Sequence, residues 1–275
     1  IEDVAEATSK PFWFQLYTMN DEDYVRRLIQ RAKDANCSAL VITLDLQILG
    51  QRHKDLKNGL SAPPKLTPKT IANLMTKWAW GIEMLGAKRR EFGNIVGHVE
   101  GISDASSLGA WTSEQFDLSL DWGKIAKLKE MWGGKVILKG ILDAEDAKMA
   151  VNVGADAIVV SNHGGRQLDG ALSSIRMLPQ ILDAVGGEVE VILDSGIRSG
   201  QDVLKSLAMG ADGTMIGRAF VYGLGAMGQK GVTTALEVIQ KELDTTMALC
   251  GERSVKNLGR HNLLIPKDFE GDWQD

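Results

Sequence analysis

The stretch GADAIVVSNHGGRQ, residues 154–167, joins an apolar run to a glycine-rich loop. The run Ala157–Val160 has the length and composition of a buried strand, and Gly154 before it ends a helical pattern. In a parallel α/β barrel, the loops that follow the strands carry the chemistry. This loop offers His163, which can take a proton, and Arg166, whose planar fork can hold a carboxylate. The stretch therefore predicts a parallel-strand fold with a reactive loop at a strand end.

The same pattern recurs outward from this stretch. A second Gly-Ala-Asp turn at residues 210–212 also separates a helical pattern from an apolar run, which indicates an internal repeat. Six strands are predicted, within residues 11–17, 39–45, 135–141, 157–160, 190–198 and 213–218. Helical patterns lie between or after them, at residues 21–32, 124–131, 143–153, 201–209 and 233–250. A further helical pattern ends at Ala184, before the fifth strand. This alternation predicts an α/β fold, either a (β/α)₈ TIM barrel or a doubly wound sheet.

The barrel is the favoured fold class because no Gly-x-Gly-x-x-Gly motif follows any strand, as a dinucleotide-binding doubly wound sheet would require. Six strands are two fewer than the usual barrel holds. The chain begins at Ile1 without a methionine. We therefore expect one barrel domain over residues 1–275 that is incomplete at its N-terminus, with its first two strands missing from this chain.

A long insertion interrupts the alternation at about residues 46–120. A connection of this length inside a barrel is typical of a lid, a binding loop or a partly disordered segment. Trp78 and Trp80 lie before the basic cluster Lys88–Arg90, so residues 60–115 could make a peripheral membrane contact. Packing of these tryptophans within the insertion, or against another subunit, explains them equally well.

Composition excludes several classes of protein. The net charge of −5 and the isoelectric point near 5.5 argue against nucleic-acid binding. Cys37 and Cys250 are the chain's two cysteines, which suggests a reducing compartment, and neither has the spacing of a metal site, so we expect no metal ion. No run is apolar enough to span a membrane.

Parallel strands would bring the polar residues at their carboxyl ends to one face. Asp45 ends a buried run and needs a partner, for which His163 is the natural candidate, since a carboxylate orients an imidazole that acts as a base. Lys139 could stabilise negative charge on an electron-accepting ring, or it could be ion-paired with Asp45 or Asp194. Arg198 and Arg218 follow glycines at the last two strands, where barrels commonly bind phosphate. The structural alternative is that His163, Arg166 and these arginines are ordinary surface or paired charges.

The loop Ser161–Gln167 resembles the active-site signature of the FMN-dependent α-hydroxy-acid dehydrogenases and oxidases. The resemblance extends to Phe14–Tyr17, Thr43–Asp45, Leu138–Gly140, Asp194–Arg198 and Ile216–Arg218. Within this family, residues 164–174 and Trp78–Trp80 look most like the bacterial L-lactate dehydrogenases. Family members have a longer N-terminal part that supplies two strands and further flavin contacts, so the resemblance implies that this chain holds only part of the FMN site.

The resemblance implies a role for each site residue. His163 would be the catalytic base with Asp45 behind it, while Tyr17, Arg52 and Arg166 would bind the substrate. The FMN-binding residues would be Gln15, Thr43, Lys139, Ser161, Asp194, Gly196, Arg198, Gly217 and Arg218.

The activity that the resemblance implies is oxidation of L-lactate to pyruvate with FMN, with electrons passed to a quinone or another respiratory acceptor. The resemblance also implies a homo-oligomer, with a tetramer expected by analogy with relatives. The protein would lie in the cytoplasm or be peripherally bound to the cytoplasmic side of the bacterial inner membrane. Two alternatives stay open: an oxygen-using oxidase of another 2-hydroxy acid such as glycolate, and a non-catalytic barrel that binds a phosphate ligand.

Overall fold

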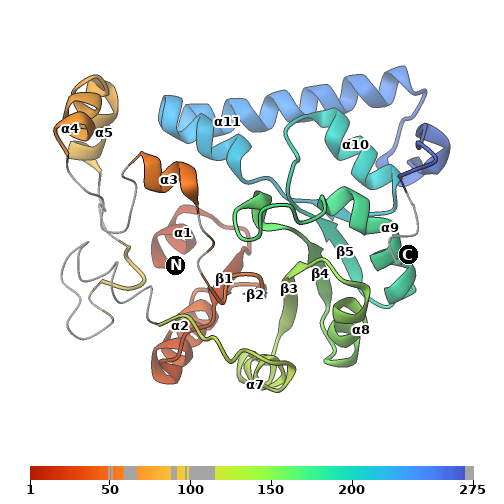
Figure 1. Ribbon diagram of the computed structural model, residues 1–275, viewed down its shortest axis with the longest axis horizontal. Coiled ribbons are helices and arrows are strands. Elements are labelled where there is room, and N and C mark those ends of the chain that lie inside the picture. The colour runs from red at the N-terminus through yellow and green to blue at the C-terminus, as the bar shows by residue number, and fades with distance from the viewer. Residues whose placement is uncertain are drawn as a thin grey trace. The chain divides into compact units, whose positions relative to one another are not determined.

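The computed structural model describes residues 1–48, 50, 52–58, 67–87, 92–96, 98 and 115–269. Its elements are α1 (Glu2–Ala7), β1 (Trp13–Tyr17), α2 (Glu22–Asp34), β2 (Ala39–Thr43), α3 (His53–Lys57), α4 (Pro68–Met75), α5 (Trp78–Gly86), α7 (Trp122–Trp132), β3 (Lys135–Ile141), α8 (Ala144–Asn152), β4 (Ala157–Val160), η1 (His163–Gly165), α9 (Ser174–Val185), β5 (Glu190–Leu193), α10 (Gly200–Ala208), β6 (Gly213–Thr214), α11 (Arg218–Leu249), η2 (Val255–Asn257) and η3 (Arg260–Asn262) (Figure 1).

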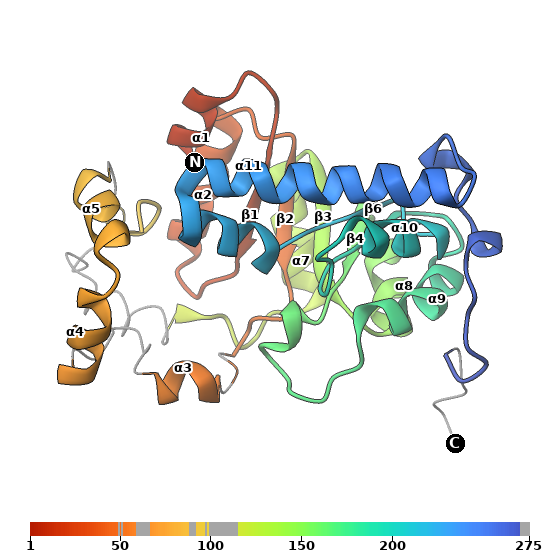
Figure 2. The ribbon, with the colours of Figure 1, turned by 90° about the horizontal axis from the view of Figure 1, so that it is seen from above.

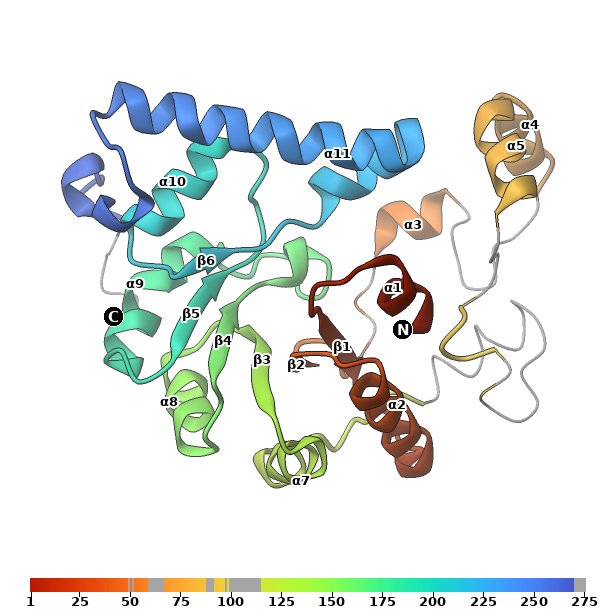
Figure 3. The same ribbon diagram turned by 180° about the vertical axis from the view of Figure 1, so that it is seen from behind.

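The six strands form a sheet in the order of the sequence, β1-β2-β3-β4-β5-β6. The pairs from β3 to β6 are parallel, and Figure 3 shows these strands side by side. A doubly wound sheet reverses its strand order at a switch point, whereas a barrel adds each strand next to the last. The α/β fold with barrel-type strand order is therefore confirmed, and the two further strands stay a prediction.

The chain divides into two compact units, each described by itself below. One unit comprises Ile1–Leu40 and Leu46–Gly134, and we call it the insertion unit because it holds the insertion. The other comprises Val41–Asp45 and Lys135–Asp275, and we call it the loop unit because it holds the Ser161–Gln167 loop. The single domain expected over residues 1–275 stays a prediction.

In the loop unit, the strands form the core. All four residues of β4 are buried, which explains its unbroken apolar sequence, since a parallel strand is covered on both faces. Helices α8 and α9 pack together and against β3, β4 and β5, while α10 packs against β6 and α11. Figure 1 shows α8 and α9 following these strands in turn.

The two Gly-Ala-Asp turns make the same hydrogen bonds to a neighbouring strand. Asp156 donates its N–H to the carbonyl of Val136 and accepts the Val136 N–H on its carboxylate, at 2.9 and 2.8 Å. Asp212 repeats both hydrogen bonds with Val191, at 2.8 and 2.7 Å. Each aspartate thereby satisfies backbone groups of a neighbouring strand at a buried valine. This confirms the repeat that the sequence predicted and gives its physical reason.

Helix α11 corrects two boundaries expected from the sequence. The helix begins at Arg218, not at residue 233, and β6 ends at Thr214. Met227 and Gly228 have non-helical dihedral angles, and the chain folds back there, as Figure 2 shows. A Cβ atom on Gly223 would lie 2.4 Å from the carbonyl oxygen of Gly231, so the two arms of this bend require glycine where they touch.

In the insertion unit, Asp21 caps α2 by accepting the N–H of Tyr24 at 2.8 Å. The described part of the insertion contains α3, α4 and α5 and no strand. Thr67 caps α4, and Pro68 occupies its first turn, both of which are typical of helix starts. Among the described residues, no helix is both long and apolar enough to cross a membrane.

Candidate active site

The centre of the site is a contact between His163 and Asp45. The structure brings together these residues, 118 positions apart, with Nδ1 of the imidazole 2.9 Å from Oδ1 of the carboxylate. Their side chains are 17% and 14% exposed, so both are largely shielded from water. A carboxylate only accepts hydrogen bonds, so Nδ1 carries the proton and Nε2 keeps a lone pair that can accept one. The predicted pairing of Asp45 with His163 is confirmed.

A glycine makes room for this carboxylate. Gly140 interrupts the pairing of β3 with β4, where the register shifts between Lys139 and Ile141, and its φ is +107°. A Cβ atom at this position would lie 2.6 Å from Cγ of Asp45. Gly140 therefore serves as a bulge that lets the aspartate reach the strand end beside His163.

A buried ion pair lies next to this pair. Lys139 Nζ is 3.0 Å from Oδ2 of Asp194, and it donates to Oγ of Ser161 at 3.1 Å. Ser161 is fully buried and donates to the same Asp194 oxygen at 2.6 Å. Burial acts to raise the pKa of Asp194, but the Lys139 ammonium and the hydrogen bonds outweigh it and hold that pKa below its usual value. Of the two roles considered for Lys139, ion pairing with Asp194 is confirmed.

Two of the predicted phosphate-binding residues, Arg198 and Arg218, line one pocket beside α11. Arg218 donates to the carbonyl of Gly164, which ties the first residue of α11 to the His163 loop. Arg198 and Arg218 share a pocket of about 310 Å³, and neither forms an ion pair with a carboxylate among the described residues. The pocket is lined by Arg198, Arg218, Ala219, Tyr222, Ala235, Val238 and Ile239. Two guanidiniums beside the N-terminus of a long helix fit an anionic group such as the phosphate of FMN.

Three predicted residues belong to the insertion unit. Gln15 donates to the hydroxyl of Tyr17 at 3.2 Å, so the two side chains share one side of β1 as predicted. The ring of Tyr17 packs edge-on against Phe116. Arg52 directly precedes α3. The structure groups these three apart from the loop unit, which holds Thr43, Asp45, Lys139, Ser161, His163, Arg166, Asp194, Gly196, Arg198, Gly217 and Arg218. The individual roles of all these residues stay predictions.

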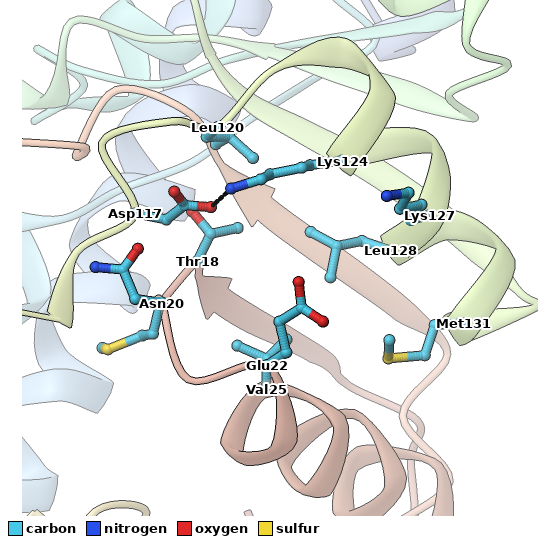
Figure 4. Close-up of a pocket in the computed structure, with 11 residues that line it drawn as sticks. Thr18, Asn20, Glu22, Val25, Asp117, Leu120, Lys124, Lys127, Leu128 and Met131 are labelled. Carbon is cyan, nitrogen blue, oxygen red and sulfur yellow. Dashed lines mark hydrogen bonds and ion pairs between the residues drawn. The ribbon is translucent and has the colours of Figure 1, made fainter.

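A second pocket, of about 130 Å³, lies within the insertion unit and contains none of the predicted site residues (Figure 4). Its polar centre is Lys124, whose ammonium is 2.7 Å from the carboxylate of Asp117. Glu22 and Lys127 also line it, together with apolar side chains such as Leu128. Because its central charges already neutralise each other, this pocket lacks the chemistry found around His163.

Sequence reasoning missed one residue of the site. Ser195 accepts the N–H of Gly164 through its hydroxyl at 3.0 Å, so it contacts the His163 loop directly. The available signal was its position between Asp194 and Gly196 in a strand-end loop already assigned to the site.

Comparison with known proteins shows the family to which this chain belongs. The model of the FMN-dependent dehydrogenase family matches residues 1–265. An L-lactate dehydrogenase of Pseudomonas paraeruginosa is 46% identical over 269 residues, which are 96% of this chain and 69% of that protein. The solved structure of (S)-mandelate dehydrogenase, a monotopic membrane protein, matches this chain with a TM-score of 0.89 and 33% sequence identity. The match covers 96% of this chain and 69% of the mandelate dehydrogenase chain. A mandelate oxidase structure has a TM-score of 0.73 at 37% identity, with 94% and 65% covered. The chain belongs to the FMN-dependent dehydrogenase family.

Proposed function

We propose that this chain acts as an FMN-dependent L-2-hydroxy-acid dehydrogenase whose substrate is L-lactate. The observation that carries the proposal is the 2.9 Å contact between His163 and Asp45, with His163 on the loop that also bears Arg166. A protein that only binds a phosphate ligand needs no such base. The L-lactate dehydrogenase that is 46% identical to this chain supports lactate as the substrate.

In this proposal, His163 accepts a proton from the substrate at Nε2, and Asp45 stabilises the imidazolium that results. Arg166 and Arg52 hold the substrate carboxylate, and Tyr17 donates a hydrogen bond to the substrate. Bound FMN supplies the two-electron acceptor that oxidation of a hydroxyl to a carbonyl requires. The proton can come from the hydroxyl or from the α-carbon of the substrate, and His163 is the base in both cases.

The residues proposed to bind FMN lie in the strands or in the segments that follow them. Gln15, Thr43 and Lys139 would contact the isoalloxazine, with Ser161 nearby, and Asp194 would contact the ribityl chain. Gly196, Arg198, Gly217 and Arg218 would hold the phosphate. The shared pocket of Arg198 and Arg218 supports the last assignment.

The visible spectrum of the FMN-loaded protein, recorded without oxygen while L-lactate is added, tests the function. We expect the flavin band to bleach, because lactate reduces the cofactor. A band that responds to (S)-mandelate but not to L-lactate would favour the second candidate, an enzyme for aromatic 2-hydroxy acids, which the mandelate-enzyme structures support. Failure of all such acids to bleach a bound flavin would overturn the dehydrogenase proposal. Reoxidation by a quinone but not by oxygen would identify the proposed acceptor.

We also propose that the enzyme contacts the membrane peripherally, at the cytoplasmic face, through the insertion. On α5, Trp78, Ile82 and Leu85 share one helical face and are 71%, 62% and 71% exposed. The (S)-mandelate dehydrogenase structure is that of a monotopic membrane protein, which supports this assignment. The basic cluster at residues 88–90 lies outside the described residues. The proposed tetramer likewise stays a prediction.

Serine at Trp78, Ile82 and Leu85 together is expected to weaken binding to anionic phospholipid vesicles by at least about 10-fold, because three large apolar side chains no longer enter the interface. Cosedimentation with the vesicles measures the effect. Serine at Leu249 and Leu264, which are 84% and 100% exposed, is the matched control and should leave vesicle binding unchanged. Equal losses in both variants would contradict a specific role for α5.

A further inference from the structure

Ser195 has a backbone conformation that its residue type rarely adopts. It follows β5, and its φ is +79°, in the left-handed region that favours glycine. Asn36 and His163 are the other described non-glycine residues with positive φ. Such strain persists where surrounding contacts enforce it, and it concentrates at functional sites. The contacts of the Ser195 hydroxyl therefore need an explanation.

These contacts reach the loop that carries the proposed base. The Ser195 hydroxyl accepts the N–H of Gly164 at 3.0 Å. The same oxygen is 3.3 Å from Oγ of Ser161 and 3.4 Å from Oδ2 of Asp194. The backbone of Ser195 is held as well, since its carbonyl accepts from the buried hydroxyl of Ser174 at 3.2 Å. Ser195 thus connects the end of β5 to the loop after β4.

The loop needs such outside support. His163, Gly164 and Gly165 all have positive φ, at 55°, 67° and 69°. The N–H of His163 donates to Oγ of Ser161 at 3.1 Å, and the N–H of Gly164 donates to Ser195. Two serine hydroxyls therefore accept the hydrogen bonds that a regular helix or strand would send to backbone carbonyls.

The ion pair of Lys139 and Asp194 fixes the directions of the Ser161 and Ser195 hydroxyls. Each hydroxyl has one proton to donate. Ser161 accepts from Lys139 and His163 and gives its proton to Asp194 at 2.6 Å. Ser195 accepts from Gly164 and donates its own proton to Oδ2 of Asp194 at 3.4 Å, since both lone pairs of the Ser161 hydroxyl are already used. The buried charges of Lys139 and Asp194 thereby orient both hydroxyls.

We propose that Ser195 is a positioning residue, whose hydroxyl holds the Gly164 N–H and so fixes the direction of the His163 imidazole. The effect on turnover rests on the proposed function, whereas the effect on the loop does not. A hydroxyl at this position accounts for the strained φ, because glycine would relieve the strain but could not accept the hydrogen bond.

The loop is tested first, by hydrogen–deuterium exchange of peptides that span residues 161–167 in the full chain. Ser195→Gly removes the hydroxyl and relieves the strain, and Ser195→Ala removes the hydroxyl but keeps the strain. Both variants should exchange faster in this peptide by about 10-fold, the factor expected for one lost hydrogen bond. Ser206→Ala is the control, because Ser206 is more buried than the half-buried Ser195 but donates only within α10, at 2.7 Å to the carbonyl of Asp202.

Turnover is tested next, in the FMN-loaded protein with L-lactate. We expect kcat to fall by about 10-fold in both Ser195 variants, with little change in KM or in FMN affinity, because the base is misdirected while binding is retained. Unchanged exchange in both variants would overturn the inference, as would an effect confined to Ser195→Ala, which would assign it to strain. Weaker FMN binding with unchanged exchange would make Ser195 a cofactor residue instead. If the parent protein does not turn over lactate, the proposed function fails, and the exchange result still decides the role of Ser195 in the loop.

Discussion

Replacing His163 with glutamine is expected to slow reduction of the flavin by L-lactate by a factor of about 10² to 10⁴, the usual contribution of a positioned general base. Glutamine can still donate a hydrogen bond to Asp45, but its amide cannot accept a proton at neutral pH. The 2.9 Å contact to Asp45 shows that the imidazole is already oriented, so the loss should fall on the proton-transfer step. Anaerobic stopped-flow absorbance of the flavin band measures this rate directly.

His261→Gln is the matched control for this experiment. His261 also contacts a carboxylate, with Nε2 at 3.1 Å from Glu252, but its side chain is 64% exposed and lies in η3. We expect this variant to reduce at the parent rate. The flavin spectrum and the dissociation constant for FMN should be unchanged in His163→Gln, since the His163 imidazole is proposed to act on the substrate and not to bind FMN. Reduction of His163→Gln at the parent rate would rule out His163 as the base.

Part of this site could be predicted from the sequence because parallel strands place the residues at their carboxyl ends close together. Residues that directly follow buried strands must meet at one edge of the sheet, whatever their separation along the chain. That rule paired Asp45 with His163 and offered Asp194 as a partner for Lys139, and the structure has both contacts. The repeated Gly-Ala-Asp turns gave the helix-to-strand boundaries in the same way, because a glycine with positive φ ends each helix.

Other features depend on tertiary contacts that no local pattern encodes. Glycine disfavours helices, so the glycine-rich stretch before residue 233 was not expected to be helical. It is helical because Gly223 and Gly231 touch across the bend of α11, where a side chain would not fit. The role of Ser195 was hidden for a similar reason, since its left-handed φ and its bond to Gly164 exist only once the strands have assembled.

The number of strands could be predicted from the sequence, but the placement of the substrate-binding residues could not. Counting apolar runs gave six strands, and the structure has six in sequential order. The relative placement of Tyr17 and Arg52 against the His163 loop does not follow from that count, because they belong to the other compact unit. Their assignment to the substrate therefore depends on the family resemblance, and kinetic experiments on Arg52 and Tyr17 variants have to decide it.

Replacing Lys139 with methionine is expected to lower the free energy of unfolding by about 3–5 kcal/mol at neutral pH, the cost of leaving a buried charge without its partner. Lys139 and Asp194 are 9% and 14% exposed, and 3.0 Å separates the ammonium from the carboxylate. Lys148→Met is the matched control: that lysine is 51% exposed and pairs with Glu145 at 2.6 Å, and such surface pairs contribute about 0–1 kcal/mol. Urea denaturation followed by circular dichroism measures both variants.

The pH dependence of this loss tests its electrostatic origin. In the parent protein, the pKa of Asp194 is held below its usual value, so the pair stabilises the fold above the unfolded-state pKa and loses this effect as the pH falls through the folded-state pKa. Without Lys139, the attraction that offsets burial is lost and only hydrogen bonds still oppose it, so we expect the pKa of Asp194 to rise and the variant to regain stability on protonation. The difference between parent and variant should therefore be largest near neutral pH and shrink towards pH about 4, the unfolded-state pKa of aspartate. The double variant Lys139→Met/Asp194→Asn, which removes both charges, should recover part of the stability at neutral pH. A loss that is independent of pH, with no recovery in the double variant, would show that Lys139 acts through packing of its aliphatic chain and not through its charge.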